Sequence, residues 1–286
     1  MRLRLVLVAS LALVAVVALG AYFVLPNVRP QLPTVPKQTC EARTTTGSVT
    51  LDPSQMANAA TITAVGIRRG LPDRAVVIAL ATALQESKLR NLSHGDRDSL
   101  GLFQQRPSQG WGTQAEVTDP RYAAGRFYAA LVRVRGWETM RVTEAAQRVQ
   151  KSAYPEAYEK WSDESAVLAD ALTGRATRAV VCTGGVAPER RGVAAALALG
   201  DGLRLDWGDV TTVADTSVLG LVLAATDSPV GWRYAHWLVA HSVERGVARV
   251  RFDDQEWTAR SGVWSPVTPD GTGSDARVVA EVYAAA

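Results

Sequence analysis

Apolar residues recur at helical spacing through the middle of the chain. They stand three or four positions apart, which gathers them on one face of a helix. Five stretches carry this pattern: 55–69, 74–87, 121–136, 144–153 and 155–174. The pattern predicts five helices between residues 40 and 182 and indicates no strand there, which is typical of an all-α domain.

Capping residues and helix breakers mark the ends of these helices. The predicted starts share a polar cap or a proline: Asp52 with Pro53, Pro72, Asp119 with Pro120, Thr143, and Pro155. Gly70 ends the first helix and Gly174 ends the fifth.

The first 25 residues have a different character. Residues 1–4 hold two arginines and no acid, and residues 5–25 form an uninterrupted apolar run. As a helix, this run would be about 31 Å long, enough to span a bilayer core of roughly 30 Å. We therefore expect a transmembrane anchor over 1–25 with a cytoplasmic N-terminus. A signal peptide cleaved near Gly20, giving a secreted protein, is the alternative, and both interpretations place the rest of the chain outside the cytoplasm.

A proline-rich linker and two cysteines follow. Four prolines within 26–39 favour an extended spacer. Cys40 and Cys182 are the only cysteines, and they flank the predicted helical domain, which we therefore bound at 40–182. In an oxidising compartment they would form a disulfide that stabilises the fold by about 5 kcal/mol on the chain-entropy argument. Two buried free thiols are the alternative.

The pattern changes after Cys182. Residues 183–192 combine glycine, proline and charge, as linkers do. A short helix over 193–200 and an amphipathic helix over 230–246 are predicted next. Four segments then have strand character: 247–253, 255–260, 263–267 and 276–284. We expect a small α+β domain with an antiparallel sheet over 193–286, of no recognised family and with an unknown protein partner.

The histidines and tryptophans of this second domain are predicted to be structural. His236 and His241 are five positions apart, the wrong spacing for two metal ligands on one helix face. Trp257 and Trp264 are expected to be core or cross-strand partners. A binding surface formed by the two tryptophans is the alternative.

The stretch from residue 85 to residue 112 holds the candidate chemistry. Glu86 stands on the last turns of the second predicted helix, directly after an apolar run. Burial there penalises the charged carboxylate and raises its pKa from roughly 4.3, as a general acid near neutral pH requires. Polar and aromatic residues follow: His94, Asp96 and Asp98 in a loop, an apolar turn over 101–104, and Trp111 between glycines. One carboxyl, an amide donor and an exposed aromatic suit a sugar-cleaving groove.

Two motifs in this stretch resemble those of a known group of enzymes. Glu86-Ser87, followed about fifteen residues later by Gly101-Leu102-Phe103-Gln104, resembles the Glu-Ser and Gly-Leu-Met-Gln signature of lytic transglycosylases and goose-type lysozymes, with Phe103 in the Met position. The resemblance covers roughly residues 50–180, about half of the chain. It implies a mainly α, lysozyme-like domain.

The resemblance also implies a catalytic role for Glu86. Its carboxyl would protonate the glycosidic oxygen between N-acetylmuramic acid and N-acetylglucosamine in peptidoglycan. The same group, now a base, would help the muramic acid 6-hydroxyl close a 1,6-anhydro ring. This is a single-acid mechanism.

An inverting lysozyme would need a second carboxylate. Asp96 is the natural candidate and Asp98 is close in sequence, although a solvated turn is an equal interpretation of both. The loop is one residue shorter than in goose-type lysozymes, and Arg106 stands where those enzymes have a water-positioning aspartate. This departure favours the transglycosylase. His94, Asp96 and Asp98 do not complete an oxygen-ligand loop, so no metal is expected.

Further positions are candidates for substrate binding, Trp111 because of its aromatic ring and the others through the resemblance. These candidates are Ser87, Gln104, Gln105, Trp111 and Tyr154. Ser87 would orient substrate or acid, or is simply a small residue at a helix end, and Trp111 would stack on a sugar ring or cover the core. Tyr154 partly matches an Ala-Tyr-Asn segment whose tyrosine contacts the acid, with Pro155 in place of the asparagine; core packing is the alternative. Leu102 and Phe103 are expected in the core.

Composition excludes several other classes of protein. The 286 residues, 47% hydrophobic and 21% charged, suit about two globular domains. A net charge of +3 gives no reason to expect nucleic acid and suits an anionic cell wall. The sequence has no phosphate-binding glycine loop, nucleophile elbow or paired-histidine zinc motif, so no cofactor is expected.

We therefore expect a membrane-anchored, extracytoplasmic lytic transglycosylase that acts on peptidoglycan strands through Glu86. An inverting muramidase is one alternative. The other is a wall-binding or assembly protein that keeps the fold without activity.

Overall fold

The computed structural model describes residues 38–152, 154, 156–183, 188–213, 215, 217–267 and 277–285. The anchor predicted over 1–25 lies outside the described residues, as does nearly all of the linker predicted over 26–39. None of the helices in the described part of the chain combines the length and the apolar character that a membrane crossing requires.

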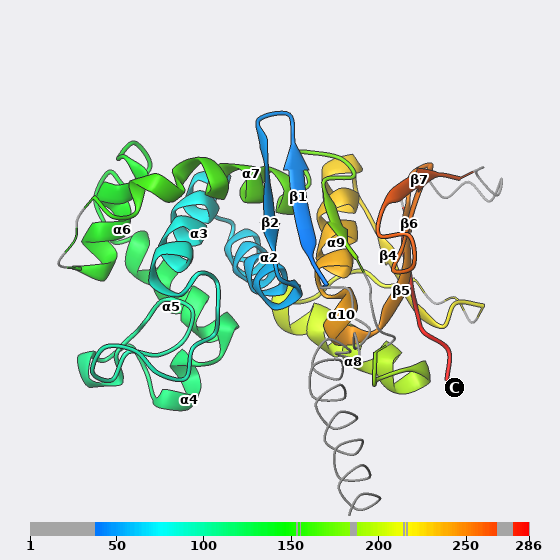
Figure 1. The fold of residues 1–286 in the computed structure, drawn as a ribbon, viewed down its shortest axis with the longest axis horizontal. Coiled ribbons are helices and arrows are strands. Elements are labelled where there is room, and N and C mark those ends of the chain that lie inside the picture. Colours follow the sequence, from blue (N-terminus) through cyan, green and yellow to red (C-terminus); the bar gives the residue numbers. More distant parts are fainter. Residues whose placement is uncertain are drawn as a thin grey trace, which may run out of the picture. The chain divides into compact units, whose positions relative to one another are not determined.

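Helices dominate the described residues (Figure 1). The α-helices are α2 (Pro53–Arg68), α3 (Asp73–Ser87), α4 (Gln114–Val117), α5 (Pro120–Leu131), α6 (Val142–Gln150), α7 (Ser162–Leu172), α8 (Gly192–Trp207), α9 (Ser228–Ala240) and α10 (Ser242–Arg245). Two short 3-10 helices are η2 (Pro107–Gln109) and η3 (Glu159–Trp161).

The strands form two antiparallel sheets. They are β1 (Cys40–Thr44), β2 (Gly47–Leu51), β3 (Val180–Cys182), β4 (Gly220–Ala224), β5 (Val247–Phe252), β6 (Gln255–Thr258), β7 (Trp264–Pro266) and β8 (Arg277–Val282). The first sheet has the order β2-β1-β3 and the second the order β4-β8-β5-β6-β7. The predicted combination of helices with an antiparallel sheet is confirmed at this level.

The cap of α2 forms as the sequence predicts. Asp52 Oδ1 accepts a hydrogen bond from the Gln55 backbone N–H at 2.9 Å, and Gln55 Oε1 accepts from the Asp52 N–H at 2.9 Å. This reciprocal pair satisfies two donors that a helix start otherwise leaves unbonded. Helix α3 begins directly after Pro72 and α5 at Pro120, also as predicted.

Two other predicted helix starts are wrong. Helix α6 begins at Val142, so Thr143 lies inside its first turn and is buried, where it packs instead of capping. Helix α7 begins only at Ser162, because the chain first makes the 3-10 turn η3. Pro155 itself lies outside the described residues.

The prediction of no strand in the first half is wrong as well. Strands β1 and β2 form a hairpin, and β3 pairs with β1. Only Cys40 and Ala42 of β1 are buried. Cys40 and Ala42 alternate with Glu41 and Arg43, but this pattern covers only four residues with small apolar side chains, and β3 has only three residues, so the strand signal is weak.

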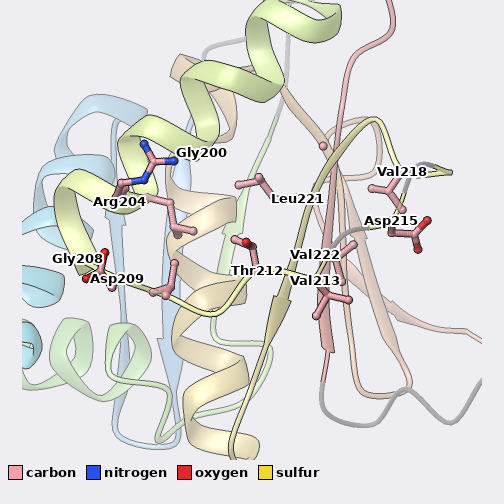
Figure 2. Close-up of a pocket in the computed structure, with 13 residues that line it drawn as sticks. Gly200, Arg204, Gly208, Asp209, Thr212, Val213, Asp215, Val218, Leu221 and Val222 are labelled. Atoms are coloured by element: carbon pink, nitrogen blue, oxygen red, sulfur yellow. The ribbon is translucent and has the colours of Figure 1, made fainter.

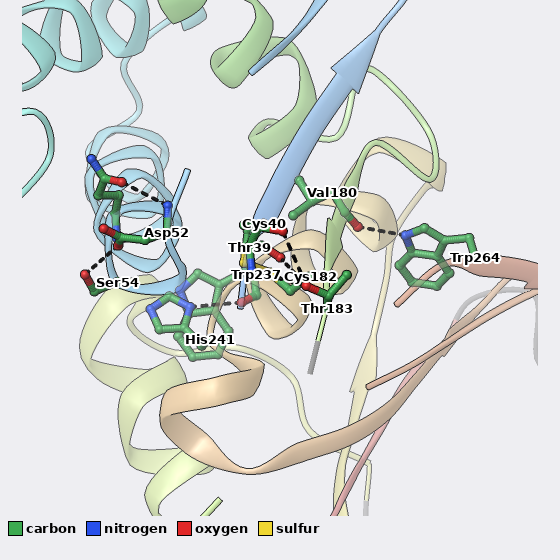
Figure 3. Close-up of a disulfide and its surroundings, with 11 residues drawn as sticks. Thr39, Cys40, Asp52, Ser54, Val180, Cys182, Thr183, Trp237, His241 and Trp264 are labelled. Carbon is green, nitrogen blue, oxygen red and sulfur yellow. Dashed lines mark hydrogen bonds between the residues drawn. A yellow bond between two sulfur atoms is a disulfide. The ribbon is translucent and has the colours of Figure 1, made fainter. Parts of the chain in front are cut away.

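The disulfide between Cys40 and Cys182 is present, as predicted. The two cysteines are directly opposite each other on β1 and β3, so the bond joins the first strand of the described chain to the last strand of the first half (Figure 3).

The segments on either side of residues 183–192 pack together. Residues Gln38–Ala286 form one compact unit with a continuous hydrophobic core that draws on both. Helix α2 contacts α3 and α5 on one side and α8 and α9 on the other (Figure 1). Trp264 Nε1 donates a 2.9 Å hydrogen bond to the Val180 carbonyl, from the second sheet to the first (Figure 3).

The second sheet follows the predicted strands. All four segments with strand character are strands, and β4 adds a fifth that the sequence did not indicate. Trp257 is opposite Trp264 in the β6–β7 pair, as predicted. His236 is fully buried; its Nε2 accepts from the Ala179 N–H at 2.9 Å and its Nδ1 donates to the Ala171 carbonyl at 2.7 Å.

Candidate active site

Glu86 stands at the exposed end of a buried helix. Helix α3 buries most of its residues, including Leu80, Ala83 and Leu84. The helix ends one residue after Glu86, and Lys88 and Leu89 adopt left-handed conformations with φ of 56° and 59°. The chain therefore turns away directly after the acid, which leaves Glu86 half-buried at the helix end.

Two side chains hold one oxygen of Glu86. The Tyr158 hydroxyl donates to Glu86 Oε1 at 2.7 Å, and Gln150 Nε2 donates to the same oxygen at 3.2 Å. Gln150 Nε2 also donates to the Phe103 carbonyl at 2.8 Å. Gln150 therefore links the acid to the turn that carries the second motif.

Burial changes the acidity of Glu86. Loss of solvation raises the pKa of its carboxyl above the usual 4.5, and the hydrogen bonds from Tyr158 and Gln150, which favour the charged form, offset only part of this. The direction is the one predicted from the apolar helix. It is the direction that a proton donor near neutral pH requires.

The turn over 101–104 is fixed from both sides. Ser87 Oγ donates to the Leu102 carbonyl at 2.8 Å, while Leu102 and Phe103 are fully buried, as predicted. Gly101 has a φ of 74°, and a Cβ there would lie 2.1 Å from the Val117 carbonyl oxygen. The motif residues Ser87 and Gly101 thus position the turn against the acid.

The two glutamines of the turn lie in different environments. Gln104 is half-buried, and its Nε2 donates to the Gly101 carbonyl at 3.2 Å. Gln105 is only 2% exposed, and its Nε2 donates to the Ala123 carbonyl at 3.1 Å. The substrate-binding role expected of Gln105 is therefore wrong, because this side chain lies in the interior and holds α5.

The two candidate second carboxylates, Asp96 and Asp98, have different surroundings. The side chain of Asp96 is 90% exposed and lies 4.0 Å from Arg97. Asp98 accepts from Arg106 Nε at 2.8 Å and from the N–H and hydroxyl of Ser108 at 2.8 and 3.0 Å. These donors hold the pKa of Asp98 well below its usual range. Among the described residues, no cluster of acids, histidines and cysteines could hold a metal ion.

The tyrosine beside the acid is Tyr158, which the sequence analysis missed. Tyr154 is 75% exposed, so its alternative role in core packing is wrong, and among the described residues the side chains that hydrogen-bond Glu86 are Tyr158 and Gln150. Two Ala-Tyr pairs, 153–154 and 157–158, follow α6 closely, and the second pair was the available signal. Gln150 carried no signal in the sequence.

A groove of about 430 Å³ lies beside this arrangement. Trp111 comes from the loop before α4, Arg126 and Arg133 from the α5 region, and Gln150 and Lys151 from the end of α6. Trp111 is half-buried against the core and also lines the groove, and its stacking on a sugar ring stays a prediction. Gln150 lines the groove and also donates a hydrogen bond to Glu86.

A second hollow, of about 440 Å³, lies between α8 and β4. Figure 2 shows Gly200 and Arg204 of α8 facing Leu221 and Val222 of β4 across it. It contains none of the residues predicted for the site.

No family model matches this chain, and no curated protein matches it either. The resemblance to lytic transglycosylases therefore stays a prediction from the two motifs.

Proposed function

We propose that this protein is a peptidoglycan lytic transglycosylase with a lysozyme-like first half and Glu86 as its single acid and base. The observation that carries the proposal is the environment of Glu86. It is half-buried, its pKa is raised, and Tyr158 and Gln150 fix one oxygen beside the turn over 101–104. A positioned carboxyl with a raised pKa next to a groove is what general acid catalysis of glycoside cleavage needs.

Glu86 performs two proton transfers in this mechanism. First its proton goes to the oxygen that links N-acetylmuramic acid to N-acetylglucosamine, and the bond between that oxygen and C1 of the muramic acid breaks. Then the carboxylate accepts the proton of the muramic acid 6-hydroxyl as this oxygen attacks C1. The products are a strand with a new free end and a 1,6-anhydromuramic acid end. Tyr158 and Gln150 stabilise the intermediate carboxylate through their hydrogen bonds.

The state of the two aspartates supports the transglycosylase over an inverting hydrolase. Asp98 is bonded to Arg106 and Ser108, and Asp96 is solvated. An inverting enzyme needs a carboxylate that activates water opposite the acid. Intramolecular attack by the 6-hydroxyl needs none.

The proposal includes a place for the reaction. A disulfide between Cys40 and Cys182 is typical of oxidising compartments, which supports an extracytoplasmic site. The apolar run over 5–25 would anchor the protein to the membrane from which it reaches the wall.

Replacement of the acid tests the proposal. Purified sacculi are digested with the wild-type protein, with Glu86→Gln and with the control Glu189→Gln, which changes an exposed glutamate. Mass spectrometry of the soluble products should detect 1,6-anhydro muropeptides with the wild type and the control but not with Glu86→Gln. Reducing ends would instead identify a muramidase. Wild-type protein that binds sacculi without releasing products would contradict the enzymatic proposal.

A further inference from the structure

The charged side chains that line the groove beside the candidate acid are all positive. Arg126, Arg133 and Lys151 line it, and no acidic residue does. Its remaining wall is apolar or neutral and includes Trp111 and Val149. A concave surface with cations of one sign concentrates its field on whatever enters.

Two of these three cations, Arg133 and Lys151, have no side-chain partner among the described residues. Arg126 Nη2 donates to the Gly110 carbonyl at 2.9 Å and so helps to hold the loop that carries Trp111. The side chains of Arg133 and Lys151 are exposed and make no hydrogen bond or ion pair with any residue that the structure describes. The two groups are therefore free to bind an anion.

The groove is continuous with the residues around Glu86. Gln150 lines the groove and donates to Glu86, and Lys151 follows it directly. Lys151 has a left-handed backbone with φ of 52°, where α6 ends. A ligand that occupies the groove would therefore touch the residue that orients the acid.

We propose that this groove binds carboxylates carried on the lactyl arm of a muramic acid residue next to the cleaved bond. The inference rests on the proposed function and names the feature of the strand that the site selects. Arginine binds carboxylates through paired N–H donors, and lysine adds a point charge. The carboxylate has two possible sources: the lactyl group itself, in strands without peptides, or the stem peptide attached to it. Neutral N-acetylglucosamine oligomers, such as N-acetylated chitotetraose, offer neither.

Binding to a protein that cannot cleave tests the inference. The background is Glu86→Gln, and the probes are soluble peptide-bearing muropeptide tetrasaccharides, the same tetrasaccharides after an amidase has removed the peptides, and chitotetraose. Affinities are measured by titration calorimetry. Arg133→Gln with Lys151→Gln should weaken binding of at least one anionic probe by about tenfold and leave chitotetraose unchanged. The control is Arg190→Gln with Arg260→Gln, two exposed arginines that do not line the groove.

The two anionic probes distinguish the sources. If the loss is confined to peptide-bearing strands, the stem peptide supplies the carboxylate. If the loss is confined to stripped strands, the lactyl carboxylate supplies it, and if both probes lose affinity, the groove binds either carboxylate. Equal affinities of the groove variant and the control for both anionic probes would overturn the inference, and so would an equal loss for chitotetraose.

The groove inference and the proposed function can fail independently of each other. Protein with intact Glu86 that releases 1,6-anhydro products equally well with or without Arg133 and Lys151 would leave the function standing and remove the inference. Charge-dependent binding by a wild-type protein that releases no products would do the reverse. Circular dichroism and the Tm of each variant verify that the exposed substitutions leave the fold intact.

Discussion

Arg121 Nε lies 2.6 Å from Asp206 Oδ1, and Asp206 is completely buried. The other carboxylate oxygen of Asp206 accepts from the Thr61 hydroxyl and from Trp237 Nε1, both at 2.8 Å. These partners come from α2, α5 and α9, while Asp206 belongs to α8. The second half of the chain thus places one buried charge against α2 and α5, two helices of the first half. His241, which stacks on Trp237, is 3.8 Å from the same oxygen.

Arg121→Met should destabilise the protein by about 3 kcal/mol, because it leaves the buried Asp206 charge without its cation. The free energy of unfolding is measured by urea denaturation at pH 7. Arg204→Met is the matched control, since Arg204 pairs with Asp201 where both side chains are 69% exposed, and such pairs contribute less than about 1 kcal/mol. Equal losses in the two variants would contradict the structural role of the buried pair.

The extent to which the sequence predicts this fold depends on how local the signals are. The starts of α2, α3 and α5 depend on residues within one turn, such as Asp52 with Gln55, and are read correctly. The β1–β3 pairing joins residues 142 positions apart, and each of the two strands buries only two residues, so no local pattern indicates the pairing. Asp206 makes one of the contacts between the two halves, and in the sequence it stands between Leu205 and Trp207 with nothing that indicates its partner Arg121.

The candidate site also has one part that the sequence predicts and one part that it does not. The acid, its raised pKa and the buried turn follow from the apolar helix and the short motif. The partners of the acid do not, because Gln150 and Tyr158 lie 64 and 72 positions from Glu86. The sequence offers Tyr154 and Tyr158 with the same preceding alanine, and only the path of the chain through η3 brings Tyr158 inward.

Tyr158→Phe should slow cleavage by about 10- to 100-fold, since it removes a hydrogen bond to a carboxylate that must bear charge during the reaction. The hydroxyl of Tyr158 lowers the pKa of Glu86, so its loss should raise that pKa further. The basic limb of the profile of kcat/KM against pH should therefore move to higher pH. Release of 1,6-anhydro products is followed from pH 4 to 9, with Tyr154→Phe as the control at an exposed tyrosine. If the basic limb did not move in Tyr158→Phe, the hydroxyl of Tyr158 would have no influence on the pKa of Glu86.

The burial of His236 should make the fold sensitive to acid. Loss of solvation lowers the pKa of His236 from 6.5 to about 4. Below pH 6.5 the unfolded chain binds a proton that the folded chain does not, so stability present above pH 6.5 is lost as the pH falls towards 4. The loss from this group is about 3 kcal/mol. Urea denaturation between pH 7 and 4 measures it, and His236→Gln should have a shallower decline over the same range. An identical slope in the variant would show that another group carries the acid sensitivity.

Gly101→Ala tests why the second motif begins with glycine. The backbone has a φ of 74° and the new Cβ would meet the Val117 carbonyl oxygen, so both the conformation and the space oppose a side chain. Gly70 has a φ of 69° but no atom within 4 Å of the position of a Cβ, so Gly70→Ala carries the conformational cost alone, about 1–2 kcal/mol. The difference between the two variants isolates the collision with Val117.

We expect Gly101→Ala to be the less stable by at least about 1 kcal/mol and to lose activity as well, because a displaced turn moves the Phe103 carbonyl that anchors Gln150 beside the acid. Thermal unfolding followed by circular dichroism, together with product release, compares them. Equal Tm values, or full activity in Gly101→Ala, would mean that the turn tolerates displacement and that the position of Glu86 does not depend on it.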